Sequence, residues 1–125
     1  MTKKVLIVDD EQNIAISVEF LMRSEGFEVV VAHDGEEGLA RIRAHRPDLV
    51  LLDVMMPKLN GFEVCAAVRA DPSLAGVRIL MLTAKDRAAE IEKGISLGAD
   101  AYIPKPFATS ELVDKVKELL KEEVE

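Results

Sequence analysis

The chain has 125 residues, of which 49% are apolar, which suffices for one domain with a buried core and is too short for two ordinary domains. Its 16 basic and 23 acidic residues give a net charge of −7, which disfavours direct binding to nucleic acid or to an anionic membrane. No apolar run approaches the roughly 20 residues that cross a bilayer, so we expect no membrane anchor, no signal peptide and a cytoplasmic location.

Five short apolar runs predict β-strands, at residues 5–8, 28–32, 49–52, 78–82 and 101–103. Most of them are continuous rather than alternating, as expected of parallel strands whose two faces are both covered by helices. A helical pattern follows each run. Its apolar positions are Ile14, Val18, Leu21 and Met22, then Leu39 and Ile42, then Phe62, Cys65, Ala66 and Val68, then Ala88, Ile91 and Ile95, and finally Leu112, Val113, Val116, Leu119 and Leu120.

Helix start and stop signals agree with this alternation. Two helix starts have an N-cap residue followed three positions later by a glutamate, at Asp34 with Glu37 and at Asn60 with Glu63. Breaks after the first, third and fourth helices are marked by Gly26, Asp71-Pro72 and Gly98. With right-handed crossovers, the chain is predicted to form a single α/β domain over residues 1–125. Its doubly wound, five-stranded parallel sheet would have the order 2-1-3-4-5, with five helices.

Acidic residues end two of the predicted strands. Asp9 and Asp10 close the first run and Asp53 closes the third, and these strands are neighbours in the predicted order. Their carboxyl ends open onto the edge where open α/β sheets bind ligands. Three hard carboxylates gathered there favour Mg²⁺, with Mn²⁺ as an alternative, over zinc. A carboxylate can also accept a phosphoryl group, and Asp53 is the candidate acceptor.

Two further strand ends bring a hydroxyl and an ammonium group to the same edge. Thr83 follows the fourth run and Lys105 follows the fifth. Thr83 can donate a hydrogen bond to a phosphoryl oxygen, and Lys105 can counter the added negative charge. The backbone amide of Ala84 is a further candidate donor.

Four motifs in order along the chain resemble the receiver domain of two-component response regulators, and the resemblance spans the whole chain. They are Val8-Asp9-Asp10-Glu11, Leu52-Asp53-Val54-Met55-Met56-Pro57 with Gly61, Leu82-Thr83-Ala84, and Tyr102-Ile103-Pro104-Lys105-Pro106-Phe107. Each motif alone is weak, but the four together are highly specific. The resemblance implies the flavodoxin-like form of the predicted fold.

The resemblance also implies roles for individual residues. Mg²⁺ binding would fall to Asp9, Asp10, Asp53 and the backbone carbonyl of Met55, and phosphorylation to Asp53. Thr83, the Ala84 amide and Lys105 would contact the phosphoryl group, Thr83 and Tyr102 would form the switch, and the Lys105-Pro106 peptide bond is a candidate for cis. Met55 and Lys85 stand where the family tunes the lifetime of the acyl phosphate.

The function implied is a phosphorylation-activated switch rather than an enzyme with a separate substrate. A sensor histidine kinase or phosphotransfer protein would load Asp53. The face built from the fourth helix, fifth strand and fifth helix would then change its affinity for an effector protein or output domain, or form a phosphorylation-dependent homodimer. No output domain follows the fifth helix, so the expectation is a stand-alone receiver or a part of a longer regulator.

Other interpretations account for single residues. Asp9 or Asp10 alone could cap the first helix, Lys105 alone could be a solvated lysine, and Tyr102 could simply pack at the sheet edge. A phosphatase of the aspartyl-nucleophile class would need a second acid two residues after Asp53, where the chain has Met55. An interaction module without the chemistry would have lost an acid, the threonine or the lysine, and none is lost.

Overall fold

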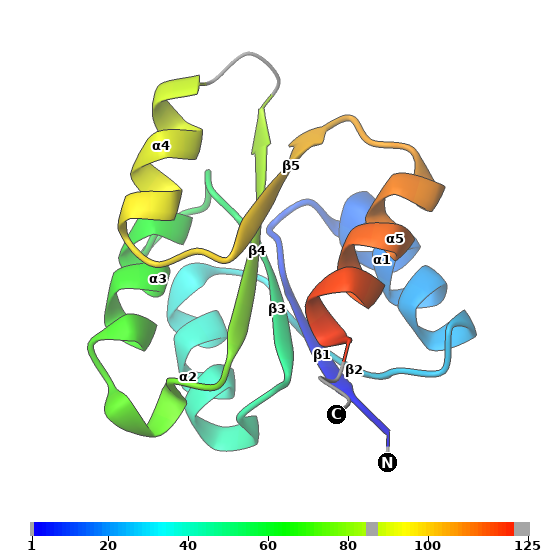
Figure 1. The fold of residues 1–125 in the computed structure, drawn as a ribbon, viewed down its shortest axis with the longest axis horizontal. Coiled ribbons are helices and arrows are strands. Elements are labelled where there is room, and N and C mark those ends of the chain that lie inside the picture. Colours follow the sequence, from blue (N-terminus) through cyan, green and yellow to red (C-terminus); the bar gives the residue numbers. More distant parts are fainter. Residues whose placement is uncertain (1, 85–87, 122–125) are drawn as a thin grey trace.

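The computed structural model describes residues 2–84 and 88–121, and over these it confirms the predicted fold. A parallel sheet of five strands has the order β2-β1-β3-β4-β5. In Figure 1, α1 and α5 cover one face of the sheet, and α2, α3 and α4 cover the other. No helix in the described ranges is long and apolar enough to span a membrane. The strands are β1 (Lys4–Val8), β2 (Glu28–Ala32), β3 (Leu49–Asp53), β4 (Arg78–Ala84) and β5 (Ala101–Lys105), and the helices are α1 (Gln12–Ser24), α2 (Gly35–His45), α3 (Gly61–Arg69), α4 (Ala88–Ser96) and α5 (Thr109–Leu120).

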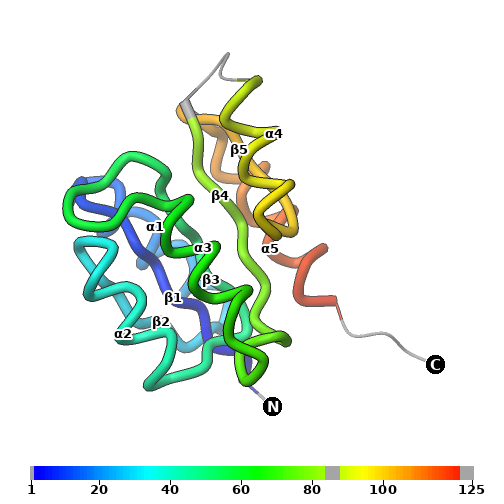
Figure 2. Tube along the Cα trace, turned by 90° about the vertical axis from the view of Figure 1, so that its left-hand side faces the viewer, coloured from blue at the N-terminus to red at the C-terminus, as the bar shows by residue number. Residues whose placement is uncertain are grey.

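Within each continuous apolar run, alternate residues belong to different cores, because successive residues of a strand point to opposite faces of the sheet. In β1, Leu6 and Val8 belong to the core beneath α2, α3 and α4, whereas Val5 and Ile7 belong to the core beneath α1 and α5. All four are fully buried. Figure 1 shows the sheet between its two layers of helices, and Figure 2 views the molecule from the side of α2, α3 and α4. Burial on both faces therefore explains why the strands contain so few polar residues.

The two predicted N-caps are present in the structure. The Asp34 side chain accepts a hydrogen bond from the Glu37 N–H at 2.8 Å, and Asn60 accepts from the Glu63 N–H at 2.9 Å. Glu63 also accepts from the Asn60 N–H, which completes a capping box at the start of α3. These caps satisfy N–H groups that have no partner within the helix. A short 3-10 helix at Pro72–Leu74, which the sequence did not predict, follows α3.

Three strands extend further toward their carboxyl ends than predicted. β3 includes Asp53, which pairs with Leu82, while β4 runs on to Ala84 and β5 runs on to Lys105, and these last two residues pair with each other. Ladder hydrogen bonds continue into these polar residues because the neighbouring strands supply partners. The candidate site residues Asp53 and Lys105 are therefore held by the sheet itself rather than by loops.

The fourth helix forms where predicted, but its apolar stripe is not buried. Ala88 is exposed, Ile91 is half-buried and Ile95 is 46% exposed. The only buried residue of α4 is Gly94. A Cβ at Gly94 would lie 2.7 Å from Sδ of Met81 in β4, so the backbone of α4 itself packs against the sheet at this point. α4 therefore contacts the sheet through its backbone at Gly94, and not through the apolar side chains that the sequence spacing indicated.

Candidate functional site

The three acidic strand ends meet at one edge of the sheet. β1 and β3 are adjacent and parallel, so residues that end them lie side by side. Asp9, Asp10 and Asp53 each place one carboxylate oxygen so that all three lie within 4.8 Å of one another. Asp9 and Asp53 are buried, whereas Asp10 is exposed. Asp9 Oδ1 accepts a hydrogen bond from the Glu11 N–H at 2.9 Å, which orients this carboxylate where the chain turns toward α1.

Lys105 joins this cluster from the end of β5. Its Nζ lies 3.2 Å from Oδ1 of Asp53, 3.3 Å from Oδ2 of Asp9 and 3.5 Å from Oε1 of Glu11. The lysine side chain is 18% exposed. One ammonium group thus lies between two buried carboxylates, which compensates part of the cost of placing them together.

The surroundings shift the proton affinity of both partners. Burial and the neighbouring Asp9 carboxylate raise the pKa of Asp53 from 3.8 to about 6, against the lowering effect of Lys105. Burial alone would lower the pKa of Lys105, but the charges of Asp53 and Asp9 raise it above its ordinary value. The cluster therefore has more negative charge than its one lysine neutralises, which favours a further cation.

Thr83 is the second-last residue of β4, the strand that pairs with β3 and its Asp53. It is buried, and within the described residues its Oγ1 has no hydrogen-bond partner. Ala84, the last residue of β4, pairs with Lys105 across the ladder. A buried hydroxyl without a partner is rare in folded proteins, so the Thr83 hydroxyl has an unused hydrogen-bonding capacity.

Tyr102 is not part of the acidic cluster. It lies on β5 opposite Met81, and its side chain is exposed on the outer edge of the sheet, with a relative accessibility of 42%. Tyr102 and Thr83 both line a small crevice against α4. The structure therefore places the two predicted switch residues on neighbouring strands with the aromatic residue facing outward.

The loop after β3 carries Met55, whose side chain is 70% exposed. The loop closes where the Gly61 N–H donates to the Val54 carbonyl at 2.9 Å. Beyond β5, the Lys105-Pro106 peptide bond is cis. Lys85, the other position implied to tune the acyl phosphate, lies outside the described residues.

A groove of about 810 Å³ opens onto the cluster from the side of α1 and α5. Asp10, Asp53 and Lys105 line its polar end. Ile14 of α1 and Phe107, which precedes α5, contribute to its apolar walls. Asp53 can thus be reached from solvent even though its side chain is buried.

The residues present fit a divalent metal ion of the Mg²⁺ type. Every candidate side-chain ligand is a carboxylate oxygen, and hard oxygen ligands are what Mg²⁺ binds in proteins. Asp10, being exposed, leaves room for the water molecules that Mg²⁺ retains. The imbalance of charge between the buried acids and the single lysine supports the same ion.

Sequence reasoning did not single out Glu11 or the groove. Glu11 belongs to the first of the four motifs, and its carboxylate lies 3.5 Å from Nζ of Lys105. Its position directly after Asp9 and Asp10 was the one feature of the sequence that could have indicated its place near the cluster. The apolar wall formed by Ile14 and Phe107 has no such signal, because each residue also fits an ordinary amphipathic pattern.

Comparisons with known proteins agree with this fold. Residues 5–117 match the family model described as "Response regulator receiver domain". The chain is 45% identical over 121 residues to the DNA-binding response regulator MtrA of Mycolicibacterium paratuberculosis, covering 97% of this chain and 52% of MtrA. The structure is similar to that of a putative response regulator from Chloroflexus aurantiacus, with a TM-score of 0.93, 38% identity, and coverage of 98% and 100% of the two chains.

A further solved structure has a metal in the corresponding kind of domain. It is the receiver domain of the sensor histidine kinase PA1611 from Pseudomonas aeruginosa, described with a magnesium ion coordinated in its active site cleft. Its TM-score is 0.88 at 26% identity, over 98% of this chain and 100% of that one. The chain spans about half the length of the curated relatives it matches.

Proposed function

We propose that this chain, which belongs to the family of response regulator receiver domains, is a phosphorylation-activated signalling switch that accepts a phosphoryl group on Asp53. The observation that carries the proposal is the position of Asp53. Its carboxylate is buried at the end of a central strand, 3.2 Å from the Lys105 ammonium and within the cluster of Asp9 and Asp10. It is also open to the groove through which a donor can approach.

In the proposed reaction an Asp53 carboxylate oxygen attacks the phosphorus atom of a phosphohistidine. The new P–O bond forms as the P–N bond breaks, and the electron pair of that bond remains on the imidazole nitrogen of the donor, which takes up a proton. The product is an acyl phosphate on Asp53. Lys105 would stay close to the new phosphoryl oxygens, and the Thr83 hydroxyl and the Ala84 amide would donate hydrogen bonds to them.

Metal binding is proposed for Asp9, Asp10, Asp53 and the backbone carbonyl of Met55, with Mg²⁺ as the ion and Mn²⁺ as an alternative. When bound, the ion would neutralise negative charge on the phosphoryl oxygens. The similarity to the PA1611 receiver domain, which is described with magnesium in its active site cleft, supports this choice. Asp10 is the ligand whose role is easiest to isolate, because it is exposed and has no part in the core.

The output is proposed to pass through the face formed by α4, β5 and α5. Thr83 would move toward the phosphoryl group, and Tyr102, now 42% exposed, would turn inward. A ligand must favour one state by roughly 5.5 kcal/mol to shift an equilibrium from 1:99 to 99:1, which several charge-assisted bonds around one phosphoryl group can supply.

The partners proposed are a sensor histidine kinase or phosphotransfer protein as donor, and an effector protein, an output domain or a second copy of the chain as target. Residues 1–125 would form one receiver module, which leaves nucleic-acid binding to another domain or protein. MtrA, with which the chain shares 45% identity, is named a DNA-binding regulator, and this supports an output in gene control and a cytoplasmic location.

The test of this proposal uses Mg²⁺ and acetyl phosphate as a small phosphodonor. Intact-mass analysis is expected to show one added phosphoryl group in the unmodified protein and none in Asp53→Asn. Equal labelling of the two proteins would remove Asp53 as the acceptor. Turnover of a generic aryl phosphate would instead support a phosphatase.

A second measurement isolates the metal site. Asp10→Ala is expected to weaken Mg²⁺ binding at least about tenfold, because the cluster loses one of its carboxylates. Its unfolding midpoint in metal-free buffer should stay close to that of the unmodified protein, since Asp10 is exposed. Unchanged Mg²⁺ affinity would exclude Asp10 from the site.

A further inference from the structure

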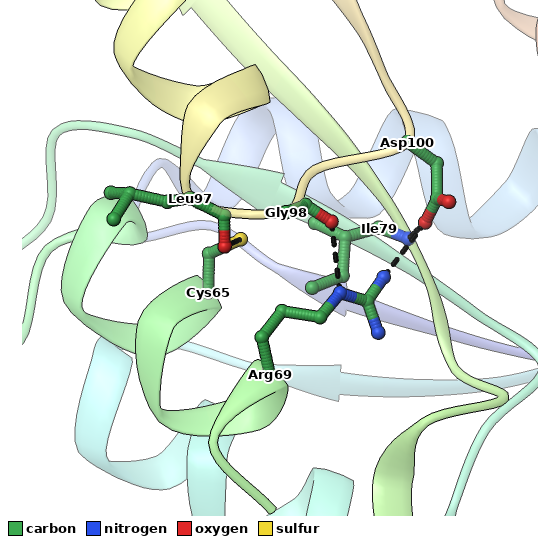
Figure 3. Close-up of polar contacts among 6 residues, drawn as sticks. All are labelled: Cys65, Arg69, Ile79, Leu97, Gly98 and Asp100. Carbon is green, nitrogen blue, oxygen red and sulfur yellow. Dashed lines mark hydrogen bonds and ion pairs between the residues drawn. The ribbon is translucent and has the colours of Figure 1, made fainter.

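One arginine ties the carboxyl end of α4 to α3 and β4 (Figure 3). Arg69, the last residue of α3, donates from Nε to the Gly98 carbonyl oxygen and from Nη2 to Oδ2 of Asp100, both at 2.8 Å. The same Asp100 oxygen accepts from the Ile79 N–H at 2.7 Å, near the start of β4. We call these four residues, Arg69, Ile79, Gly98 and Asp100, the Arg69 latch.

The turn after α4 is shaped to receive the arginine. Gly98 has a φ of +109°, and a Cβ there would lie 2.5 Å from Cγ of Arg69. Glycine at this position therefore both ends the helix and leaves space for the arginine stem. Beside the latch, Sγ of the buried Cys65 lies 3.6 Å from the carbonyl oxygen of Leu97 (Figure 3). Two side chains of α3 thus contact backbone carbonyls at the end of α4.

Other parts of α4 also face the core, since Oε1 of Glu90 is buried and Ile91 is half-buried. Gly94 is its only buried residue, and Nζ of Lys93 lies 4.7 Å from the ring centroid of Phe62. Ala88 and Ala89, in the first turn, are exposed. Because Gly94 is the one fully buried residue of α4, apolar burial along the helix is small, and the polar contacts of the latch add to what fixes its carboxyl end.

The latch lies at the far ends of the elements whose near ends form the site. β4 runs from the latch residue Ile79 to Thr83 and Ala84. β5 begins directly after Asp100 and carries Tyr102. α3 starts at Gly61, where a Cβ would lie 2.5 Å from the Asp53 carbonyl oxygen, and it ends at Arg69. α3, β4 and the start of β5 thus all have one end at the Arg69 latch. A change at Asp53 can reach α4 through these three elements.

We propose that Arg69 is a positioning residue for the switch. It holds the carboxyl end of α4 and the start of β5 in one place, so that phosphorylation moves the first half of α4 and Tyr102 about a fixed base. The inference rests on the proposed phosphorylation of Asp53. Coupling between two sites requires elements with defined alternative positions. Loss of the Arg69 contacts therefore weakens the coupling between Asp53 and Tyr102, and not only the stability of the fold.

The test compares Arg69→Met with a matched control, Arg23→Met. Arg23 makes the same kinds of contact on the other face of the sheet, donating to Glu19 and to the Val29 carbonyl oxygen. The chain has one tyrosine and no tryptophan, so its tyrosine fluorescence reports on Tyr102 alone. This signal is measured with and without Mg²⁺ and acetyl phosphate, together with the amide hydrogen exchange of residues 93–99. Arg69→Lys, which retains the charge but not the planar fork, is measured beside them.

The unmodified protein and Arg23→Met are expected to show a phosphorylation-dependent Tyr102 signal with steady protection of residues 93–99. In Arg69→Met these amides are expected to exchange at least about tenfold faster, and the Tyr102 response to fall to about half or less while Asp53 is still labelled. Arg69→Lys should lie between the two, and it keeps the test decisive if Arg69→Met does not fold.

Two results would overturn the inference alone: Asp53 labelled and the Tyr102 response full in both Arg69 variants, or a response lost equally in Arg23→Met. Absence of labelling in the unmodified protein would overturn the proposed function, and this inference with it.

Discussion

Gly35, the first residue of α2, has no side chain, and this allows the loop that carries Met55 to lie against the start of the helix. A Cβ at Gly35 would overlap the carbonyl oxygen of Leu59, in the same loop. We expect Gly35→Ala to lower the free energy of unfolding by about 1–3 kcal/mol, since backbone must move to make room. Urea denaturation measures this loss.

Gly76→Ala is the matched control for this prediction. A Cβ at Gly76 meets nothing within 4 Å, and its φ lies outside the left-handed region. This substitution should be neutral or stabilising by up to about 1 kcal/mol, because alanine restricts the unfolded chain. Equal midpoints for the two variants would show that the loop yields to the added methyl group.

Asp53 predicts how stability depends on pH in metal-free protein. Because burial and Asp9 raise its pKa from 3.8 to about 6, the folded state holds this proton more tightly than the unfolded chain. Its stabilising contribution is complete below about pH 4 and is lost as the pH rises through about 6. The loss should be on the order of 1–3 kcal/mol, and Asp53→Asn should abolish it.

This pH dependence is measured by denaturation in chelator at several pH values from about 4 to 8. Only the difference between the two proteins matters, since other groups titrate in both. A difference that does not change across this range would mean that the surroundings do not raise the pKa of the Asp53 carboxyl.

At the scale of the element, α2 is followed by an arginine in a backbone conformation that is unfavourable for residues other than glycine. Arg46 follows the helix with a φ of +47°, and its N–H donates to the Ile42 carbonyl oxygen at 2.8 Å. Glycine adopts this left-handed conformation without the steric cost that other residues carry. Arg46→Gly is therefore expected to raise the free energy of unfolding by about 0.5–1 kcal/mol.

Arg46→Ala separates this backbone effect from loss of the arginine side chain. Alanine keeps the Cβ and thus the conformational cost, so this variant should show none of the gain. Thermal unfolding of the three proteins gives the comparison, and a gain of the same size in both variants would assign the effect to the side chain instead.

The elements themselves were predictable where one physical signal dominated. Apolar runs identified the strands because both sheet faces are buried, and Asp34 and Asn60 marked helix starts through local hydrogen bonds. The burial of α4 was not predictable from its spacing, since Gly94 contacts Met81 through the backbone. Nor was the contact of Arg69 with Asp100, because an arginine that ends a helix usually remains solvated.

At the scale of the whole molecule, the site exists only when the sheet is complete. Asp53 and Lys105 end β3 and β5, Asp9 directly follows β1, and Lys105 lies 96 residues from Asp9 in the chain. The predicted strand order brought them to one edge, which is why the cluster could be anticipated. The distances among them depend on strands extending to Asp53 and Lys105, which local patterns did not show.

Because Lys105 compensates two buried carboxylates, it links global stability to metal binding. Lys105→Met is expected to lower the free energy of unfolding in chelator by about 1–3 kcal/mol, since Asp9 and Asp53 then repel each other without a cation. Mg²⁺ should recover this loss and raise the thermal midpoint of the variant more than that of the unmodified protein, because no ammonium competes with it.

The matched control for this prediction is Lys4→Met, at the opposite edge of the sheet. Lys4 lies 3.9 Å from Glu28 with 26% of its side chain exposed, so it is a lysine of similar burial away from the cluster. Its variant should respond to Mg²⁺ as the unmodified protein does. Equal increases in thermal midpoint for Lys105→Met and Lys4→Met would contradict the view that the lysine and the metal compensate the same two carboxylates.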